Sequence, residues 1–368
     1  MLFGGMVRFS HSHHGTAFAP GVSATSERND IFDSKLHKNP MTVTHRVRSF
    51  TTEAAISLAH TLKPLQRGTG DPTTQLRKDG FWTALCPNSP TVLWIQPPAS
   101  TTQPTTVTAH AFGSAPEALE QVLAGVPQLL GVDESALQGW AEFAQALQAD
   151  AWRGLLPSAV IRAHHEHPGL RLPATSDLVG ELFRVVLEQK VTHDQARASW
   201  RWLVRSYGTP APQVPLTGAP RLMVPPSASR VWQIPSWSWH RGGVQPPLAR
   251  TMTVVASRAD TLATLGQTVS IDELASRLTA LPGIGPWTVA ETLQRTHGAA
   301  DLVSVGDYHL AHHVGEALIG RRVDDHQMLE LLAPFAGHRH RVVRLIHLSG
   351  LRFSRFGPKL APMDFRGF

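Results

Sequence analysis

The chain has 368 residues, which is long enough for two or three domains and a sizeable core. Hydrophobic residues make up 42% and charged residues 17%, as in an ordinary soluble globular protein. The formal net charge of +6 favours a polyanionic partner without requiring one. The single cysteine, Cys86, excludes a disulfide framework within a monomer, an all-cysteine zinc site and an iron–sulfur cluster. No apolar run reaches the length of a membrane span and no secretory signal is evident, so we expect a cytoplasmic protein.

Residues 1–40 differ in composition from the rest of the chain. They are rich in His, Ser, Gly, Asn and Asp and lack hydrophobic periodicity, which predicts a disordered or weakly attached extension. A new segment, "MTVTHRVRSFTTEAAISL", begins at Met41. Our hypothesis is that this methionine is the natural start and that the extension is non-native. The histidines of "HSHH" are expected to belong to a solvated tail, and no metal site is expected.

Strand-like and helical patterns alternate between residues 42 and 150. The segment "THRVRSF" has the residue alternation of a β-strand. The segment "DGFWTALCPNSPTVLWIQ" is predicted to form two strands around a turn at 87–90, and "TTQPTTVTAHAF" is a further strand-rich stretch. Helical spacing is found in "TEAAISLAHTLKPL", "APEALEQVLAGVPQLLGV" and "DESALQGWAEFAQAL". These patterns predict a small N-terminal α+β domain over 42–150.

Nearly every segment from 151 to 355 has helical periodicity. A helix over "TSDLVGELFRVVLEQKV" is followed by a capping box of Thr192 and Gln195, which starts a second helix that Gly208 closes. Ser270 and Glu273 form another capping box ahead of "IDELASRLTA". The predicted fold class is therefore α+β, in which an all-helical core over 151–355 follows the N-terminal domain and precedes a basic tail over 356–368.

Two of the predicted helices, "IDELASRLTA" and "PWTVAETLQRTHG", are separated only by residues 281–285, "LPGIG". Glycines allow backbone conformations that other residues avoid and let the backbone approach a ligand closely. The amides that open the second helix have no internal partner and suit a phosphate. A tight corner shaped by sterics alone is the alternative, but the whole stretch, placed between capped helices in a basic chain, favours a phosphate grip.

The stretch "LPGIGPWTVAETL" with the later "VGDYHL" resembles the helix-hairpin-helix–Gly/Pro–Asp motif of DNA glycosylases. Within that superfamily, the chain is most similar to 3-methyladenine DNA glycosylase II. Residues 167–208 resemble the family's first core helices and residues 340–350 resemble its closing helix, so that the resemblance extends over about 45–355. It implies a helical glycosylase core that binds double-stranded DNA.

The resemblance implies that Asp307 is the catalytic aspartate. An N-glycosidic bond breaks through a transition state with positive charge on the sugar, and a nearby carboxylate stabilises this charge and orients or deprotonates the attacking water. The alternative role of Asp307 is that of a helix N-cap. Asp301, Asp324 and Asp325 lack the motif context and are predicted to be surface or cap residues.

Superfamily members that also cut the DNA backbone carry a lysine in the helix after the hairpin, where this chain has Trp287. No lysine occurs between Lys190 and Lys359. The resemblance therefore implies a monofunctional enzyme that uses water and leaves an abasic site. Trp287 suits alkylated purines, because a cationic base stacks on an electron-rich ring; a buried core position is the alternative. The predicted base-pocket residues are Trp287, Tyr308, Glu291, Trp237 and Trp239.

Glu291 departs from the family, which often has an aromatic residue one helical turn after the position of Trp287. It is either a solvated helix residue or a pocket residue that favours a cationic base or accepts a base N–H. The prediction of alkylated purines therefore has an alternative, which is another damaged base on the same scaffold.

The corner from Gln189 to Thr192 matches the family's inserting loop, which fills the gap left by the extruded nucleotide. Whether Gln189, Lys190 or Val191 does so is open, and an ordinary helical corner is the alternative. Arg339 and Arg344 are further candidates for phosphate contacts or solvated charges. The predicted DNA-binding residues are Leu281, Gly283, Ile284, Gly285, Thr288, Gln189, Lys190, Val191 and Arg341.

Together these observations predict a monofunctional DNA glycosylase of base-excision repair that removes damaged purines of the 3-methyladenine or 7-methylguanine type. We expect it to act as a monomer on double-stranded DNA containing damaged bases, in the nucleoid of a bacterium and without a cofactor. A monovalent cation at the hairpin carbonyls, as in relatives, is left open. The alternative from a different class is a helix-hairpin-helix protein that binds DNA without catalysis.

Overall fold

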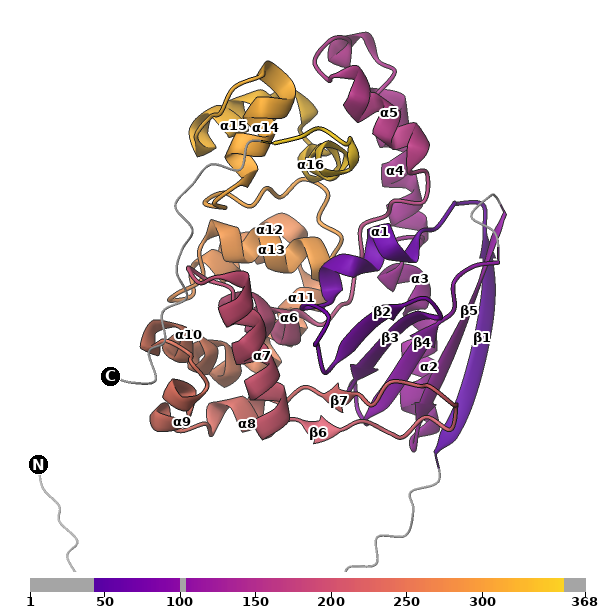
Figure 1. Ribbon diagram of the computed structural model, residues 1–368, viewed down its shortest axis with the longest axis vertical. Coiled ribbons are helices and arrows are strands. Elements are labelled where there is room, and N and C mark those ends of the chain that lie inside the picture. Colours follow the sequence, from indigo (N-terminus) through magenta and orange to yellow (C-terminus); the bar gives the residue numbers. More distant parts are fainter. Residues whose placement is uncertain (1–42, 100–103, 354–368) are drawn as a thin grey trace, which may run out of the picture. The chain divides into compact units, whose positions relative to one another are not determined.

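The computed structural model describes residues 43–99 and 104–353, which belong to a unit that begins at Thr42 (Figure 1). The extension predicted over 1–40 and the basic tail predicted over 356–368 lie outside the described residues. In the described ranges, no helix is long and apolar enough to cross a lipid bilayer.

The first part of the chain forms a five-stranded antiparallel sheet with strand order β1–β5–β4–β3–β2. Strands β3 and β4 pair on either side of the turn predicted at 87–90, with Leu85 opposite Thr91. With the helices that follow, the sheet confirms the predicted α+β fold class. The strands are β1 (Thr44–Thr52), β2 (Thr74–Arg77), β3 (Gly80–Leu85), β4 (Thr91–Ile95) and β5 (Thr105–Gly113).

The two faces of the sheet pack against different parts of the chain. Successive strand residues point to opposite faces, so the neighbours Phe81 and Trp82 enter different hydrophobic clusters. Phe81 packs in a cluster that includes Leu62 and Leu119, and Trp82 packs in one that includes Leu222. The segments that supply these covers are α1 (Leu58–Leu62), α2 (Pro116–Ala124), α3 (Val126–Leu129), β6 (Thr209–Pro210) and β7 (Met223–Val224).

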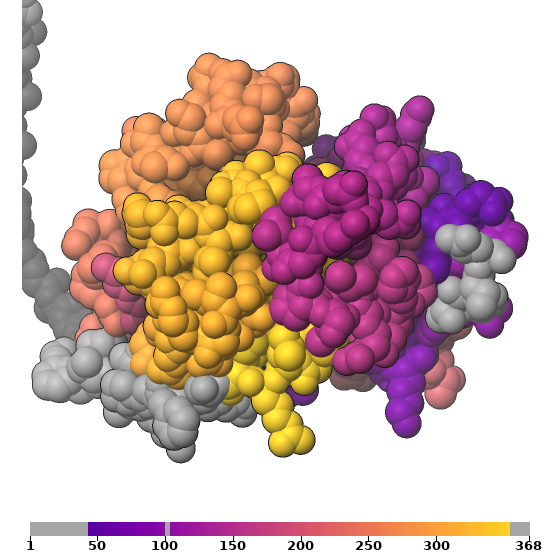
Figure 2. Space-filling model, turned by 90° about the horizontal axis from the view of Figure 1, so that it is seen from above, coloured from indigo at the N-terminus to yellow at the C-terminus, as the bar shows by residue number. Residues whose placement is uncertain are grey.

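A further hydrophobic cluster joins helices that are far apart in the sequence. Trp140 and Phe143 pack with Val314 and Leu345, and Figure 2 shows the earlier helices in magenta beside the C-terminal ones in yellow. The boundary predicted at residue 150 therefore does not separate two hydrophobic cores. The helices are α4 (Glu134–Ala146), α5 (Ser158–Glu166), α14 (Leu310–Ile319), α15 (Asp325–Leu332) and α16 (Arg339–Leu348).

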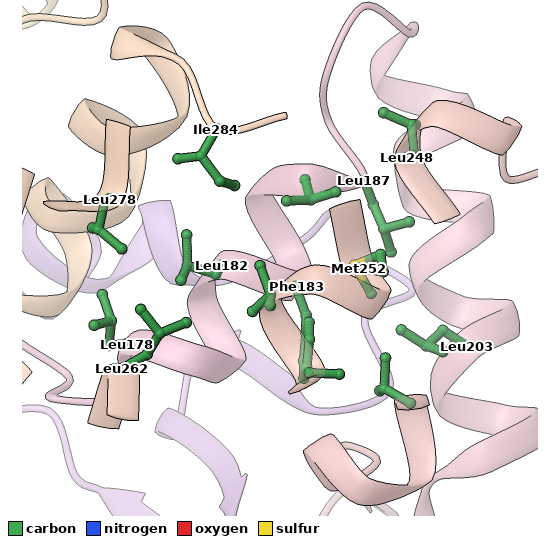
Figure 3. Close-up of a cluster of buried hydrophobic side chains, with 14 of the residues drawn as sticks. Leu178, Leu182, Phe183, Leu187, Leu203, Leu248, Met252, Leu262, Leu278 and Ile284 are labelled. Carbon is green, nitrogen blue, oxygen red and sulfur yellow. The ribbon is translucent and has the colours of Figure 1, made fainter. Parts of the chain in front are cut away.

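A cluster among the middle helices, called the third cluster from here on, includes Leu182, Met252 and Ile284 (Figure 3). The predicted capping box of Thr192 and Gln195 is present at the start of α7, and Gly208 ends that helix, as predicted. The helices are α6 (Leu178–Val186), α7 (His193–Tyr207), α8 (Ala228–Trp232), α9 (Ser236–Arg241), α10 (Pro246–Ser257), α11 (Ala259–Thr268), α12 (Ile271–Thr279) and α13 (Pro286–Thr296).

A buried network of charges ties the segment after α1 to helices α6 and α13. Arg67 donates to Glu181 and its Nε lies 2.8 Å from Glu188 Oε1. Glu181 also pairs with Arg184 at 3.2 Å and with Arg295 at 3.6 Å. Because Glu181 is only 1% exposed, these cations satisfy a carboxylate that would otherwise be costly to bury.

Candidate active site

The hairpin at 281–285 joins α12 to α13. Gly283 has φ +84°, a backbone conformation that favours glycine, and an added Cβ would overlap the Thr251 hydroxyl. Ile284 is buried in the third cluster, which anchors the turn. Ser270 caps α12 by accepting from the Glu273 N–H. The predicted capping box is incomplete there, because the Glu273 carboxylate pairs with Arg277 on the next turn.

The N-terminus of α13 offers backbone amides to an anion. Gly285 is the N-cap and no side chain caps the helix. Pro286 occupies the first helical position, where the missing N–H removes no helical hydrogen bond. The helix dipole and the open amides favour a phosphate at this end. No described atom lies within 4 Å of a Cβ added at Gly285, so a DNA backbone has room to approach.

We expect Gly283→Ala and Gly285→Ala to separate folding from DNA binding. Gly283→Ala should lower the free energy of unfolding by about 1–3 kcal/mol, because alanine is strained at positive φ. Gly285 has φ −104°, so its alanine variant should stay within about 1 kcal/mol of the parent. The added methyl should nevertheless weaken duplex binding. Urea unfolding and fluorescence anisotropy measure the two effects, and undiminished DNA affinity in Gly285→Ala would place the phosphate elsewhere.

The corner between α6 and α7 is tied to the hairpin. Gln189 Nε2 donates to the Gly283 carbonyl and to Thr288 Oγ1, each at 2.9 Å. Thr288 is 2% exposed and its hydroxyl is bound by Gln189, so its side chain supports the corner. A DNA contact through the Thr288 backbone N–H, at the start of α13, stays a prediction. Gln189 is likewise held by the hairpin. Lys190 is exposed with φ +53°, and Val191 packs against the third cluster, which leaves Lys190 at the tip.

We expect Lys190→Ala to reduce turnover on duplex DNA by about tenfold, because a tip residue that fills the gap offsets part of the unstacking cost. Single-stranded substrate has no such gap, and its turnover should be unchanged. Alanine keeps the requirement for positive φ, so the backbone strain is matched. Single-turnover rates on both substrates test this, and an equal loss on single strands would assign Lys190 to a phosphate contact.

A cavity of about 430 Å³ is lined by Asp307 and by residues of α13, the helix that follows the hairpin. Its volume is in the range of small-molecule sites. Glu291 and Ser304 line it as well, so the helix after the hairpin and the loop before α14 meet here. The other lining residues are Pro64, Pro173, His193, Gln294, Arg295, Val303, His309, Leu310, His313, His340, Val343, Arg344, His347 and Leu348.

Asp307 is a helix cap, and it also lines the cavity. Its Oδ1 accepts from the backbone N–H groups of His309 and Leu310, at 2.8 and 2.9 Å, where α14 begins. Among the described residues, no hydrogen bond is found to Oδ2. Asp325 supports the same loop, because its carboxylate accepts from the Gly306 N–H at 3.0 Å. The cap therefore fixes one oxygen and leaves the other available to a ligand in the cavity.

Of the other aspartates, Asp324 is a helix cap as predicted, whereas Asp301 is half-buried in an ion pair. Asp324 is the N-cap of α15 and accepts from Gln327 N–H. Asp301 forms an ion pair with Arg339, which places Arg339 in an intramolecular contact. Neither aspartate lines the cavity.

Glu291 is a cavity residue and is not solvated on a helix surface. Its Oε2 lies 2.7 Å from Arg295 Nη1, and its Oε1 accepts from the Ser304 hydroxyl. Burial by itself would raise the pKa of Glu291, but Arg295 and the hydrogen bonds from Ser304 and Arg295 lower it below its usual value. The carboxylate is therefore ionised at neutral pH and is bound by its own neighbours.

The base-pocket candidates with aromatic rings lie elsewhere. Trp239 is 3% exposed in the third cluster and packs near Trp202, so it is a core residue. Trp237 is 61% exposed, with the Arg241 guanidinium over its ring. Trp287 is half-buried and Tyr308 is 54% exposed, and neither lines the cavity. The aromatic rings in the cavity wall are histidine imidazoles, which the hydrophobic pattern did not indicate.

The last helix, α16, carries Arg341, which the sequence analysis predicts to bind DNA. Arg341 is only 7% exposed, lies over the Trp140 ring and contacts His338, so the prediction that it binds DNA is wrong. Burial is the reason, since a guanidinium packed inside cannot reach a phosphate. Arg344 and His340 line the cavity instead. Burial lowers the pKa of His340 well below its usual value, which keeps its ring neutral.

In the described part of the chain, no His, Cys, Asp and Glu side chains are grouped to hold a metal ion. No protein-family model and no curated protein sequence matches the chain.

Solved structures do match. The 3-methyladenine DNA-glycosylase from Archaeoglobus fulgidus is similar with a TM-score of 0.65 and 13% identity, over 82% of this chain and 97% of that one. The apo 8-oxoguanine glycosylase/lyase of Clostridium acetobutylicum is similar with a TM-score of 0.60 and 9% identity, over 84% and 98%. The latter enzyme is also solved with double-stranded DNA. This chain therefore has the fold of helix-hairpin-helix DNA glycosylases.

Proposed function

We propose that this chain is a monofunctional DNA glycosylase that hydrolyses the N-glycosidic bond of damaged purines and leaves an abasic site. The observation that carries the proposal is that Asp307 lines a cavity and has one carboxylate oxygen without a hydrogen bond among the described residues. The fold shared with DNA glycosylases supports it. Fold alone does not define an activity, so the site has to carry the assignment.

The arrangement suggests how the residues divide the work. The amides at the start of α13 hold one phosphate, and Lys190 enters the gap when the nucleotide swings into the cavity. Oδ2 of Asp307 then stabilises the positive charge that develops on the sugar. The same oxygen accepts a proton from the attacking water. Oδ1 stays bound to the helix amides, which keeps the carboxylate in one orientation.

The absence of a lyase step is part of the proposal. Among the described residues, no lysine lines the cavity, and Trp287 stands where the lyases of the superfamily carry their nucleophile. Alkylated purines are the first candidate substrates, because a cationic base is already a good leaving group. A monomeric state, the nucleoid location and a monovalent cation at the hairpin stay predictions.

A gel assay on duplexes with single lesions tests the function. We expect 7-methylguanine duplexes treated with the protein to be cut only when an abasic-site endonuclease is added, which is the signature of abasic sites without lyase activity. Cutting without the endonuclease would contradict the monofunctional assignment. Binding to a panel of alkylated, deaminated and oxidised lesions without release of any base would instead support a non-catalytic DNA-binding protein.

A further inference from the structure

Arg344 brings a positive charge into the cavity wall. It lies on α16 and donates from Nη2 to the His60 carbonyl oxygen at 2.6 Å. Among the described residues, no carboxylate lies within ion-pair distance of its guanidinium. Burial lowers the pKa of Arg344 to about 10, so the side chain is still protonated at neutral pH.

The nearby anion does not neutralise this charge. Glu291 faces the same cavity, but its two oxygens are bound by Arg295 and Ser304. Arg344 is half-buried, and its guanidinium has five N–H donors, of which one donates to the His60 carbonyl. A ligand that enters the cavity therefore meets further donors that can bind an acceptor oxygen.

These donors can stabilise negative charge that develops on the base as it is released. When a neutral base departs, the electron pair of the broken bond between C1′ and the base nitrogen stays with the base. If the base has an exocyclic oxygen, part of the negative charge resides there. A fixed cationic donor at that oxygen stabilises the departing anion. A cationic alkylated purine leaves as a neutral molecule and gains little from such a donor.

On the basis of the proposed function, we propose that Arg344 is a catalytic residue that stabilises the departing base. Its effect is expected with neutral purines that carry an oxo group, such as hypoxanthine, because these leave as anions. In the balanced step, the hydroxyl of water bonds to C1′ and its proton passes to Asp307. The base leaves with the electron pair of the broken bond, and solvent water then protonates it. Arg344 donates hydrogen bonds throughout and transfers no proton.

Two lesions with the same hydrogen-bonding edge separate this role from simple binding. Hypoxanthine and 7-methylguanine both carry an oxo group beside a ring N–H, but only the second leaves as a neutral molecule. We expect Arg344→Met to lower the single-turnover rate of abasic-site formation by about 100-fold with hypoxanthine duplexes and by less than about threefold with 7-methylguanine duplexes. Arg344→Lys, which keeps the charge, should restore part of the hypoxanthine rate.

The matched control is Arg162→Met, which removes one positive charge from the exposed surface of α5 and should change neither rate. Urea unfolding of each variant verifies that it folds. Equal losses on both lesions would assign Arg344 to a phosphate contact and overturn the inference. Wild-type protein that releases 7-methylguanine but no hypoxanthine would also overturn it, whereas release of neither base contradicts the proposed function itself.

Discussion

Asp307→Asn is expected to lower the rate of abasic-site formation by about 10²–10⁴-fold while duplex binding stays unchanged. The amide retains an oxygen that can accept from the His309 and Leu310 N–H groups, so the start of α14 should keep its cap. It carries no negative charge and is a poor base. The developing charge on the sugar therefore loses its stabilising partner.

Single-turnover kinetics and fluorescence anisotropy on the same lesion duplex measure the two quantities. Asp324→Asn is the matched control, because Asp324 also caps a helix through a side-chain oxygen but does not line the cavity. That variant should retain the parent rate. If Asp307→Asn turned over at the rate of the parent protein, the carboxylate would have only its capping role and the catalytic assignment would fail.

The largest effect on stability is expected from Glu181→Ala. The substitution leaves Arg67, Arg184 and Arg295 without the buried anion that they share. Removing one partner from a buried ion pair costs about 3–5 kcal/mol, because the remaining charge stays desolvated. Arg295 also holds Glu291, so the cavity wall should loosen and turnover should fall along with stability.

Urea unfolding at pH 7 measures the change in the free energy of unfolding. The control is Glu273→Ala, which removes an exposed carboxylate that pairs with Arg277 one turn away. Exposed pairs of this type contribute about 0.3–0.5 kcal/mol. Equal losses for the two variants would show that the buried network does not hold α6 and α13 to the segment after α1.

Features that depend on a few neighbouring residues could be predicted from the sequence. Thr192 and Gln195 form their capping box, and the glycine turn at 281–285 opens α13 with Pro286 in its first position. Asp307 could be singled out because the hairpin motif and the aspartate lie at a fixed spacing. For the capping box and the turn, the signal is a backbone conformation or a hydrogen bond that spans three or four residues, whereas Asp307 was indicated by the motif that it shares with the hairpin.

The chemical character of the cavity could not be predicted in this way. Its wall combines Pro64 with Glu291 and Arg344, which lie more than two hundred residues later in the chain. Periodicity indicates that a helix has a buried face, but it does not indicate which helix covers that face. Residue type alone predicts Trp239 in the base pocket and Arg341 at the DNA, but both are buried, Trp239 in the third cluster and Arg341 beside the Trp140 ring.

The α+β class, the glycine turn at 281–285 and Asp307 as the candidate carboxylate after it can be read from the amino-acid sequence. The packing of the folded chain shows that Glu291 is bound by Arg295, that Gln189 is tied to the hairpin and that Arg344 lines the cavity. The physical reason is that caps and turns are set by short-range hydrogen bonds. The walls of a cavity instead arise from the packing of distant segments against one another.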